Sequence, residues 1–198
     1  PADRPFYIFG SFCSPHKPFD PPQRYLDMVP YEEVDDFVPG DGELTSEEKQ
    51  ALWKKRRAYK AMIRLIDDQV GRIMDTLEQE GVLDDTVVLF TSDHGEMLGD
   101  HARLQKSIYF TESVNVPCII RHPDYLDGRR VASPIETNDV AATILEVAGL
   151  NPRQALSMRW PGFQNRVPCR SLMPLITGAA EAIRDFAFSE CQNNWEMI

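Results

Sequence analysis

The sequence predicts an α/β fold in which a mainly parallel sheet is sandwiched by helices. Strand-like and helical segments alternate along the chain in the order strand, long helix, strand, strand, helix, strand, and this alternation is typical of layered α/β proteins. The run TVVLFT at residues 86–91 is an uninterrupted strand-like stretch. Such a run is typical of a strand that is covered on both faces, as the strands of parallel sheets are.

The first part of the chain predicts one strand and one long helix. Residues 6–12, FYIFGSF, are aromatic and β-branched around one glycine and predict a buried strand. Residues 13–44 are rich in Pro, Asp and Gly and predict a long irregular segment, which in a compact domain is often functional. Thr45 and Glu48 form a capping box that begins a helix, and Gly81 ends it. A helix from Thr45 to Gly81 is long, so it can be either straight or kinked.

The second part of the chain predicts a smaller set of elements. Residues 114–121 predict a strand in which Pro117 favours a sheet edge or a strand start. Residues 135–149 predict a helix that ends with Gly149. Three further segments complete the pattern: a loop at 150–170, a short helix at 171–177 and a strand at 185–191.

Length and composition exclude several classes of protein. A chain of 198 residues can bury one sizeable core. Its formal net charge of −10 argues against nucleic acid as a partner, because phosphates are bound by basic patches. No stretch approaches ~20 apolar residues, so we expect no membrane span. The chain lacks an initial Met and reaches a strand-like run at once, so we expect a fragment or a processed piece.

Four cysteines, at positions 13, 118, 169 and 191, are spaced widely and contain no C-x-x-C pair, which indicates neither a zinc ribbon nor a disulfide framework. Cys13 needs separate attention, because FCSPHKPF at 12–19 has the outline of the modified-cysteine signature C-x-P-x-R, with Lys17 in the place of the arginine. Either Cys13 is a nucleophile, or His16 is the functional residue and Cys13 is a packing residue.

Asp93 and His94 directly follow the strand predicted at 86–91, where Gly95 eases the turn. In open α/β sheets, ligands bind beyond the carboxyl ends of strands. A carboxylate beside an imidazole suits a divalent metal ion. The alternative is that Asp93 caps the next turn and His94 packs, and the two residues by themselves leave both interpretations open.

Further candidates lie on the loop that follows. Lys106 stands twelve residues after His94, where its ammonium group can face an anion bound to a metal, or can simply be solvated. His101 is either a rival metal ligand or a donor to the loop backbone. His122 is expected at the surface or in a turn, and Glu96 either caps the segment after the turn or supports a metal ligand.

Taken together, these residues form a recognisable string. TSDHGEMLGDH at 91–101, followed by Lys106 and by ESVNVPCIIR at 112–121, closely resembles the C-terminal part of the catalytic domain of sulfatases. That family belongs to the alkaline phosphatase superfamily, with related phosphonate and phosphate ester hydrolases. GSFCSPHKPFDPP at 10–22 resembles a second block of the family, and the helix at 135–149 with RSLMPL at 170–175 resembles a third.

The resemblance implies an alkaline-phosphatase-like fold that is incomplete in this chain. Residues 1–184 would be the C-terminal portion of a sulfatase-type catalytic domain, and residues 185–198 the start of a truncated C-terminal subdomain. In the family the nucleophile is a formylglycine made from a cysteine that a helix follows. Cys13 is instead followed by SPHKPFDPP, whose prolines prevent a helix, and the matching family block lies downstream of the nucleophile. The nucleophile, and an aspartate pair that completes the metal site, would therefore lie outside this sequence.

The resemblance also implies roles for four residues. Asp93 and His94 look like two ligands of a divalent cation, usually calcium in sulfatases, with manganese or zinc in relatives that carry the Asp-His pair. His16 and Lys106 look like the pair that binds the sulfuryl or phosphoryl oxygens of the substrate and assists departure of the alcohol. Fixed donors and a cation stabilise the charge that develops there.

The expected function is that of a sulfatase-type hydrolase, which cleaves a small-molecule sulfate ester with the help of a metal ion, and this chain alone is expected to be inactive. One alternative is a phosphonate or phosphate ester hydrolase of the same superfamily. Another is a non-catalytic module that binds an anion or a partner. The ester, the metal, the compartment and the oligomeric state stay open.

Overall fold

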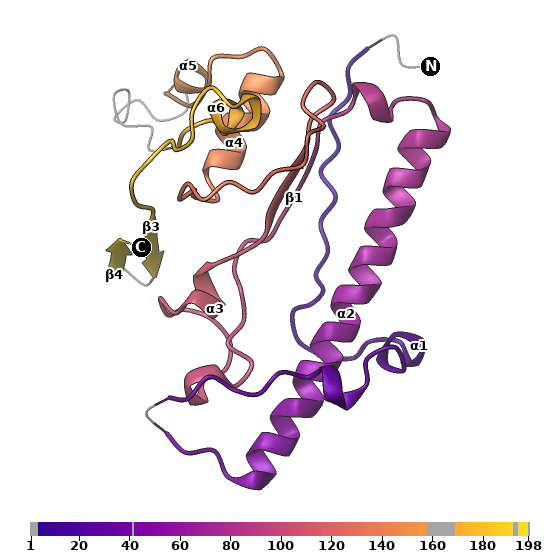
Figure 1. The fold of residues 1–198 in the computed structure, drawn as a ribbon, viewed down its shortest axis with the longest axis vertical. Helices are drawn as coiled ribbons and strands as arrows, with labels where there is room; N and C mark the ends of the chain where they lie inside the picture. The colour runs from indigo at the N-terminus through magenta and orange to yellow at the C-terminus, as the bar shows by residue number, and fades with distance from the viewer. Residues whose placement is uncertain (1–3, 41, 158–168, 192–193, 198) are drawn as a thin grey trace. The chain divides into compact units, whose positions relative to one another are not determined.

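The computed structural model describes residues 4–40, 42–157, 169–191 and 194–197. The chain divides into two compact units, each made of two segments. The first unit contains Pro1–Thr86 and Glu96–Lys106, and the second contains Val87–Gly95 and Ser107–Ile198. Figure 1 shows the elements of each unit along the chain. The predicted division into a catalytic-domain portion, residues 1–184, and the start of a C-terminal subdomain, residues 185–198, stays a prediction.

The first unit is built on helix α2 (Ser46–Gln79), which runs without a break for 34 residues and is the long helix of Figure 1. Its predicted capping box is present: the Glu48 amide donates to Thr45 Oγ1 at 3.3 Å, and the Thr45 amide donates to Glu48 Oε2 at 2.8 Å. Gly81 follows the helix at φ 68°, as the sequence predicts for a helix end. A short 3-10 helix, η2 (Leu83–Asp85), comes next.

The segment before α2 is irregular, as predicted, and contains only α1 (Gln23–Leu26) and the 3-10 helix η1 (Tyr31–Glu33) among its described residues. It attaches to α2 through a small core in which Tyr25, Val29 and Ala61 are buried. The Tyr25 hydroxyl also donates to Asp68 Oδ2 at 2.8 Å. The irregular segment is therefore anchored, through Tyr25 and Val29, to the middle of the long helix.

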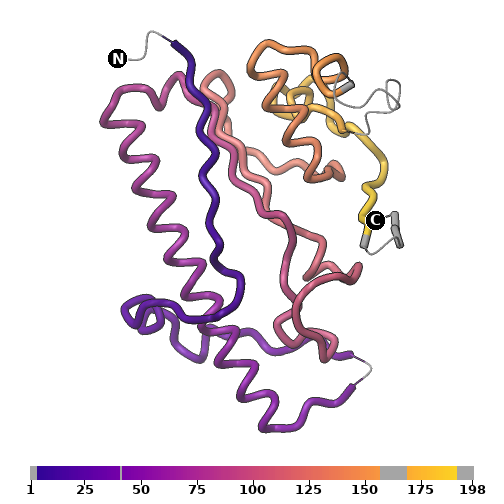
Figure 2. Tube along the Cα trace, turned by 180° about the vertical axis from the view of Figure 1, so that it is seen from behind, coloured from indigo at the N-terminus to yellow at the C-terminus, as the bar shows by residue number. Residues whose placement is uncertain are grey.

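The strand predicted at 6–12 is not present. These residues are not part of a strand, and the Ile8 and Phe9 side chains are 75% and 78% exposed. Figure 2 shows the segment as a smooth, open trace near the N-terminus. Aromatic and β-branched side chains favour a sheet only when a neighbouring strand supplies the hydrogen bonds, and no described strand pairs with this one.

The second unit contains two small sheets. Strand β1 (Val88–Thr91) pairs with β2 (Cys118–Arg121), with Val88 opposite Arg121 and Thr91 opposite Cys118. Strand β3 (Phe188–Cys191) pairs with β4 (Asn194–Met197). Both pairs are antiparallel, so the predicted parallel arrangement is wrong for the strand pairs that the structure describes. An apolar run indicates which faces are covered and says nothing about strand direction.

The connection between β1 and β2 contains no long helix. Parallel neighbours need a crossover of a dozen or more residues, usually a helix. Here the connection contains only the 3-10 helix η3 (Asp100–Ala102) and the single-turn helix α3 (Thr111–Val114). The chain therefore returns to the sheet without a crossover helix.

The helices of the second unit agree with the sequence in outline. Helix α4 (Asp139–Val147) lies within the predicted 135–149, and α6 (Met173–Thr177) within 171–177. Helix α5 (Pro152–Ser157) occupies the start of the predicted loop, and residues 158–168 of that loop lie outside the described part of the chain. Within the described residues, no helix has both the length and the apolar character that crossing a membrane requires.

Buried polar contacts hold this unit together beside a small apolar core. Asp139 is fully buried at the start of α4, where Oδ1 accepts hydrogen bonds from the Arg170 amide and from Arg184 Nη2, each at 2.6 Å. Thr143, one turn later, accepts from the Leu172 amide at 2.9 Å. These bonds attach the segments before and after α6 to α4.

Candidate active-site residues

The Asp93–His94 pair lies in the second unit, directly after β1. The Ser92 hydroxyl donates to the His94 carbonyl oxygen at 3.0 Å, and the His94 amide donates to Asp93 Oδ1 at 3.0 Å. This tight turn brings the Asp93 Oδ2 and His94 Nε2 atoms to 3.6 Å from each other. The Asp93 carboxylate is 84% exposed and the His94 ring 35% exposed, so the oxygen and the nitrogen face each other within reach of solvent.

The hydrogen bond on the other ring nitrogen of His94 determines which nitrogen is available. His94 Nδ1 lies 2.8 Å from the Gly95 carbonyl oxygen, which can only accept. In the neutral ring Nδ1 therefore carries the hydrogen, and Nε2 presents its lone pair. A backbone carbonyl on the far nitrogen is the usual support of a metal-binding histidine.

Gly95 has a steric reason to be glycine. Its amide donates to the Ser113 carbonyl oxygen at 2.8 Å, and a Cβ atom at this position would lie 2.0 Å from the Glu112 carbonyl oxygen. Any larger residue would push the turn away from α3 and change the direction of the neighbouring His94 ring. The glycine in the SDHGE string is thus required by a close approach of backbone to backbone.

The charge state of Asp93 suits a cation. Burial by itself would raise the pKa of the Asp93 carboxyl group. The electrostatic effect of the His94 side chain and hydrogen bonds from the His94 amide and the Ser92 hydroxyl outweigh burial, and the pKa is lowered. A lowered pKa keeps the group as a carboxylate, which is the form that binds metal ions.

These two side chains fit part of a metal site. Protein oxygen and nitrogen ligands lie about 2.0–2.6 Å from their ion, so two atoms 3.6 Å apart can share one. Across the described part of the chain, no cluster of three or more His, Cys, Asp or Glu side chains is suited to a metal ion. The donor pair therefore fits a divalent cation as one portion of its coordination shell.

His16 and Lys106 meet in the first unit although 90 residues separate them. Lys106 Nζ lies 3.3 Å from His16 Nε2. His16 Nδ1 lies 2.8 Å from the Lys17 carbonyl oxygen, so Nδ1 carries the hydrogen in the neutral ring and Nε2 accepts from the lysine ammonium group. The loop after Glu96 does fold back, as the sequence suggested, and it brings a cation to an imidazole.

Cys13 lies at the start of the same turn. Its carbonyl oxygen accepts the His16 amide at 3.1 Å, and its thiol is exposed, so Cys13 does not have the packing role that the sequence offered as the alternative to a nucleophile. Burial raises the pKa values of the Cys118 and Cys169 thiols. Raised values keep those two groups neutral and poorly nucleophilic.

The other candidates have local structural roles. Glu96 accepts hydrogen bonds from the Gln105 amide and, at 3.5 Å, from the Leu98 amide, so it caps its own loop. The His101 amide donates to the Val38 carbonyl oxygen at 2.9 Å. His122 Nδ1 accepts the Asp124 amide at 3.2 Å, and its ring lies against Tyr125. His122 is therefore a turn residue, as predicted.

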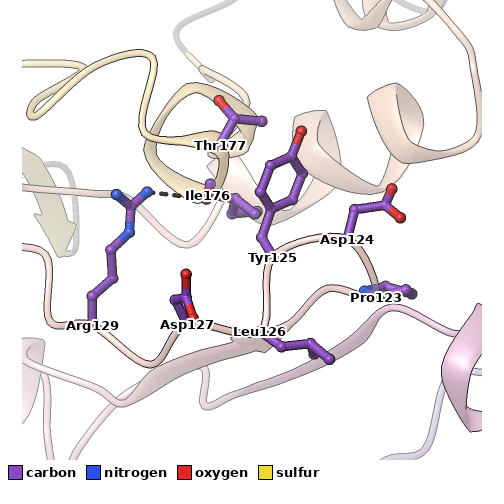
Figure 3. Close-up of a pocket in the computed structure, with 8 residues that line it drawn as sticks. All are labelled: Pro123, Asp124, Tyr125, Leu126, Asp127, Arg129, Ile176 and Thr177. Atoms are coloured by element: carbon purple, nitrogen blue, oxygen red, sulfur yellow. Dashed lines mark hydrogen bonds between the residues drawn. The ribbon is translucent and has the colours of Figure 1, made fainter.

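A surface hollow of about 380 Å³ lies elsewhere in the second unit. Figure 3 shows its lining, in which Asp124, Tyr125 and Arg129 come from one loop and Arg129 donates to the Ile176 carbonyl oxygen at 3.0 Å. None of the four predicted site residues lines it.

Arg56 is a residue that the sequence interpretation missed. It lies on α2, one turn after the buried Leu52, and is itself buried although it is charged. Its guanidinium group contacts the loop that leads to Lys106. The available signal was its position on the apolar face of the helix, where an arginine needs buried partners.

Comparison with known proteins agrees with the sequence resemblance. The sulfatase family model matches residues 1–150. An arylsulfatase of Clostridium perfringens is 34% identical over 167 residues, which are 75% of this chain and 35% of that protein. A choline-sulfatase of Rhizobium meliloti is 31% identical over 168 residues, which are 75% of this chain and 32% of that protein. This chain thus spans about a third of the length of these relatives.

A solved structure shows the fold. The phosphonate monoester hydrolase of Agrobacterium radiobacter is 30% identical, with a TM-score of 0.79 over 94% of this chain and 41% of that one. The expected alkaline-phosphatase-like fold, incomplete in this chain, is therefore confirmed, with the correction to strand direction given above. The chain belongs to the sulfatase family, within the alkaline phosphatase superfamily.

Proposed function

We propose that this chain supplies part of the active site of a metal-dependent sulfatase, which hydrolyses a sulfate ester to an alcohol and inorganic sulfate. Membership of the sulfatase family supports the reaction class. The observation that carries the assignment of residues is the contact between Lys106 Nζ and His16 Nε2 at 3.3 Å. It joins two predicted site residues that are distant in sequence, and it places an ammonium group beside an imidazole, a combination suited to binding a tetrahedral anion.

In this proposal Asp93 and His94 hold a divalent cation. The exposed carboxylate oxygen and the lone pair on Nε2 are the two donor atoms. The bound cation would neutralise charge on the ester oxygens. Calcium is the first candidate because it is usual in sulfatases, and manganese and zinc are the alternatives because imidazole suits those ions better.

His16 and Lys106 act on the ester itself in this proposal. The Lys106 ammonium group, a compact charge with three donors, binds a sulfuryl oxygen. Breaking the bond between sulfur and the ester oxygen leaves an alkoxide, which needs a proton. His16 Nε2 accepts from Lys106 in the structure, so the ring would supply this proton only after it has left that contact and been protonated, while the hydrogen bond from Nδ1 to the Lys17 carbonyl keeps the ring direction fixed. The attacking nucleophile is not one of the four residues assigned here.

A second candidate function follows from the solved neighbours. Phosphonate monoester hydrolases of Agrobacterium radiobacter and Silicibacter pomeroyi match this structure with TM-scores of 0.79 and 0.74. A phosphonate monoester presents a tetrahedral anion of similar size, so the same cation and donor pair would serve. Assays with both ester classes on the complete gene product decide between the two.

The residue assignments are tested with single variants of the complete gene product. We expect Lys106→Ala and His16→Ala each to lower kcat/KM by about 10²–10³-fold, as loss of one positioned donor does. Lys17→Ala is the matched control, since Lys17 is an exposed cation in the same turn. We expect Asp93→Asn to lower the content of bound metal, measured by elemental analysis, and His122→Ala to leave it unchanged.

Two results would overturn parts of the proposal. Full turnover of every ester by Lys106→Ala and His16→Ala would remove their catalytic roles. Binding of sulfate by the intact protein, without turnover of any ester, would favour a module that binds anions and does no chemistry.

A further inference from the structure

We propose that Arg56 is a positioning residue: from helix α2 it holds the loop 96–106 in the one conformation that places Lys106 against His16. The inference rests on the proposed function, in which Lys106 contacts the substrate. Arg56 itself has no contact with His16 or Lys106 among the interactions of the described residues, so its effect would pass through the loop.

Arg56 uses most of its guanidinium group on two loops. Nε donates to the Leu98 carbonyl oxygen at 2.9 Å, and Nη2 lies 2.6 Å from Asp100 Oδ1. Nη1 donates to the carbonyl oxygens of residues 35 and 36 at 3.1 and 2.9 Å. The group also covers the Phe37 ring, at 4.3 Å from its centroid. One planar cation thus connects residues 35–37 to residues 98–100.

The loop needs such a holder because its backbone is strained. Leu98, His101, Ala102 and Gln105 all have positive φ, between 44° and 70°, although none is glycine. L-residues avoid this conformation, and it persists only where the surroundings impose it. Asp100 provides a second anchor, because its Oδ1 also accepts the Val38 amide at 2.6 Å.

The conformation held by Arg56 extends to Lys106 through the base of the loop. The Met97 amide donates to the Gln105 carbonyl oxygen at 2.9 Å, and the Glu96 carboxylate accepts the Gln105 amide. Met97 is fully buried, which fixes that side of the base. Lys106 is the next residue, so its direction depends on the closed base and on the strained turn that Arg56 holds.

Arg57 offers a matched control on the same helix. Its Nε donates to the Val29 carbonyl oxygen at 2.6 Å, its Nη2 donates to the Leu26 carbonyl oxygen at 2.9 Å, and its guanidinium group lies over the Tyr31 ring. Both arginines therefore attach α2 to irregular backbone and to an aromatic ring. Only Arg56 is attached to the loop that carries Lys106.

The test compares Arg56→Met with Arg57→Met in the complete gene product. We expect Arg56→Met to lower kcat by about 10²-fold with a small change in KM, because a misplaced group costs about that much. Arg57→Met should retain kcat even where it lowers thermal stability. Arg56→Lys should restore part of the activity, since it keeps the charge and loses the fork of donors.

A double-mutant cycle separates positioning from general damage. If Arg56 acts through Lys106, adding Arg56→Met to Lys106→Ala should lower kcat by no more than about twofold further, within the scatter of additive effects. A full second loss in the double mutant would overturn the inference. Equal kcat values for Arg56→Met and Arg57→Met would also overturn it.

Tryptic cleavage after Arg103, an exposed residue of the loop, measures loop order without any activity assay. We expect faster cleavage in Arg56→Met than in Arg57→Met, and equal rates would overturn the inference. Full turnover by Lys106→Ala would instead refute the proposed function of Lys106. Full turnover by Arg56→Met, with Lys106→Ala inactive, would refute this inference alone.

Discussion

Each unit of the molecule contains a buried arginine that binds at least one carboxylate, and the two differ in what else they hold. Arg56, in the first unit, pairs with Asp100 and otherwise donates to carbonyl oxygens of two loops. Arg184, in the second unit, pairs with Asp139 and Glu136 at the start of α4. The side chains of Arg56 and Arg184 are only 9% and 6% exposed.

The two arginines contribute different things to their units. Arg184 offsets part of the charge of two carboxylates beside α4, the buried Asp139 and the half-buried Glu136, so Arg184 mainly supports stability. The carbonyl groups that Arg56 binds carry no net charge, and their burial depends on the path of the loops. Arg56 therefore mainly selects a loop conformation.

Arg184→Met should have the largest effect on stability. It leaves Asp139, which is fully buried, without its cation, and removal of one partner of a buried ion pair costs about 3–5 kcal/mol. Urea unfolding of the complete gene product measures the change. Arg129→Met is the control, since exposed Arg129 makes one described hydrogen bond, to Ile176, and should cost at most about 1 kcal/mol. Equal losses in the two variants would show that Arg184 does not neutralise a buried charge.

Gly99→Ala should disturb the Arg56 loop from its other side. Gly99 has a φ of 101°, and a Cβ atom there would lie 2.8 Å from the Phe37 ring, which Arg56 covers. Strain and overlap together should lower the free energy of unfolding by about 1–3 kcal/mol and lower kcat as well. Denaturant unfolding and steady-state kinetics measure the two effects.

Gly71→Ala is the matched control for that substitution. Gly71 lies inside α2, and a Cβ atom there meets nothing within 4 Å. Alanine in a helix interior should raise the free energy of unfolding by about 0.5–1 kcal/mol, with kcat unchanged. If Gly99→Ala behaved like Gly71→Ala, the loop would be free to move and the role given to Arg56 would fail.

Local features of the fold could be predicted from the sequence because neighbouring residues determine them. Thr45 and Glu48 begin α2 through a box that needs four consecutive residues, and Gly149 ends α4 through its own positive φ. Two features depend on residues far away in the sequence: the antiparallel direction of β1 and β2, and the fact that residues 6–12 do not form a strand. Each is decided by which strand lies alongside, and a local pattern does not contain that information.

The same distinction applies to the candidate site. Asp93 and His94 are adjacent, so a strand followed by a turn was enough to bring them together. The contact of His16 with Lys106 spans 90 residues and could be expected only from the resemblance to sulfatases. Arg56 was missed because an arginine on a charged helix is ordinarily solvated, and its buried partners come from loops whose path no periodic pattern describes.

The smallest predicted effect is a dependence of stability on pH that involves Glu136. Burial would raise the pKa of this carboxyl group, but the hydrogen bond and charge of Arg184, with the Phe188 amide, outweigh burial and lower it. A pKa that is lower in the folded state gives stability that is present above the unfolded value, about 4.3, and is lost as the pH falls through the folded value. Glu136→Gln should remove that part of the acid-induced loss, so its stability should fall less steeply in acid.

Urea unfolding at a series of acid pH values measures this slope, and Arg184→Met supplies the internal control. Without the guanidinium group nothing as strong opposes burial, so the pKa of Glu136 should no longer be lowered as much, and adding Glu136→Gln should then change the slope little. An equal change of slope with and without Arg184 would mean that another group sets the charge of Glu136. In that case backbone donors such as the Phe188 amide, and not Arg184, would keep Glu136 charged in acid. The two arginines would then differ in the groups that they position and not in the charge that they offset.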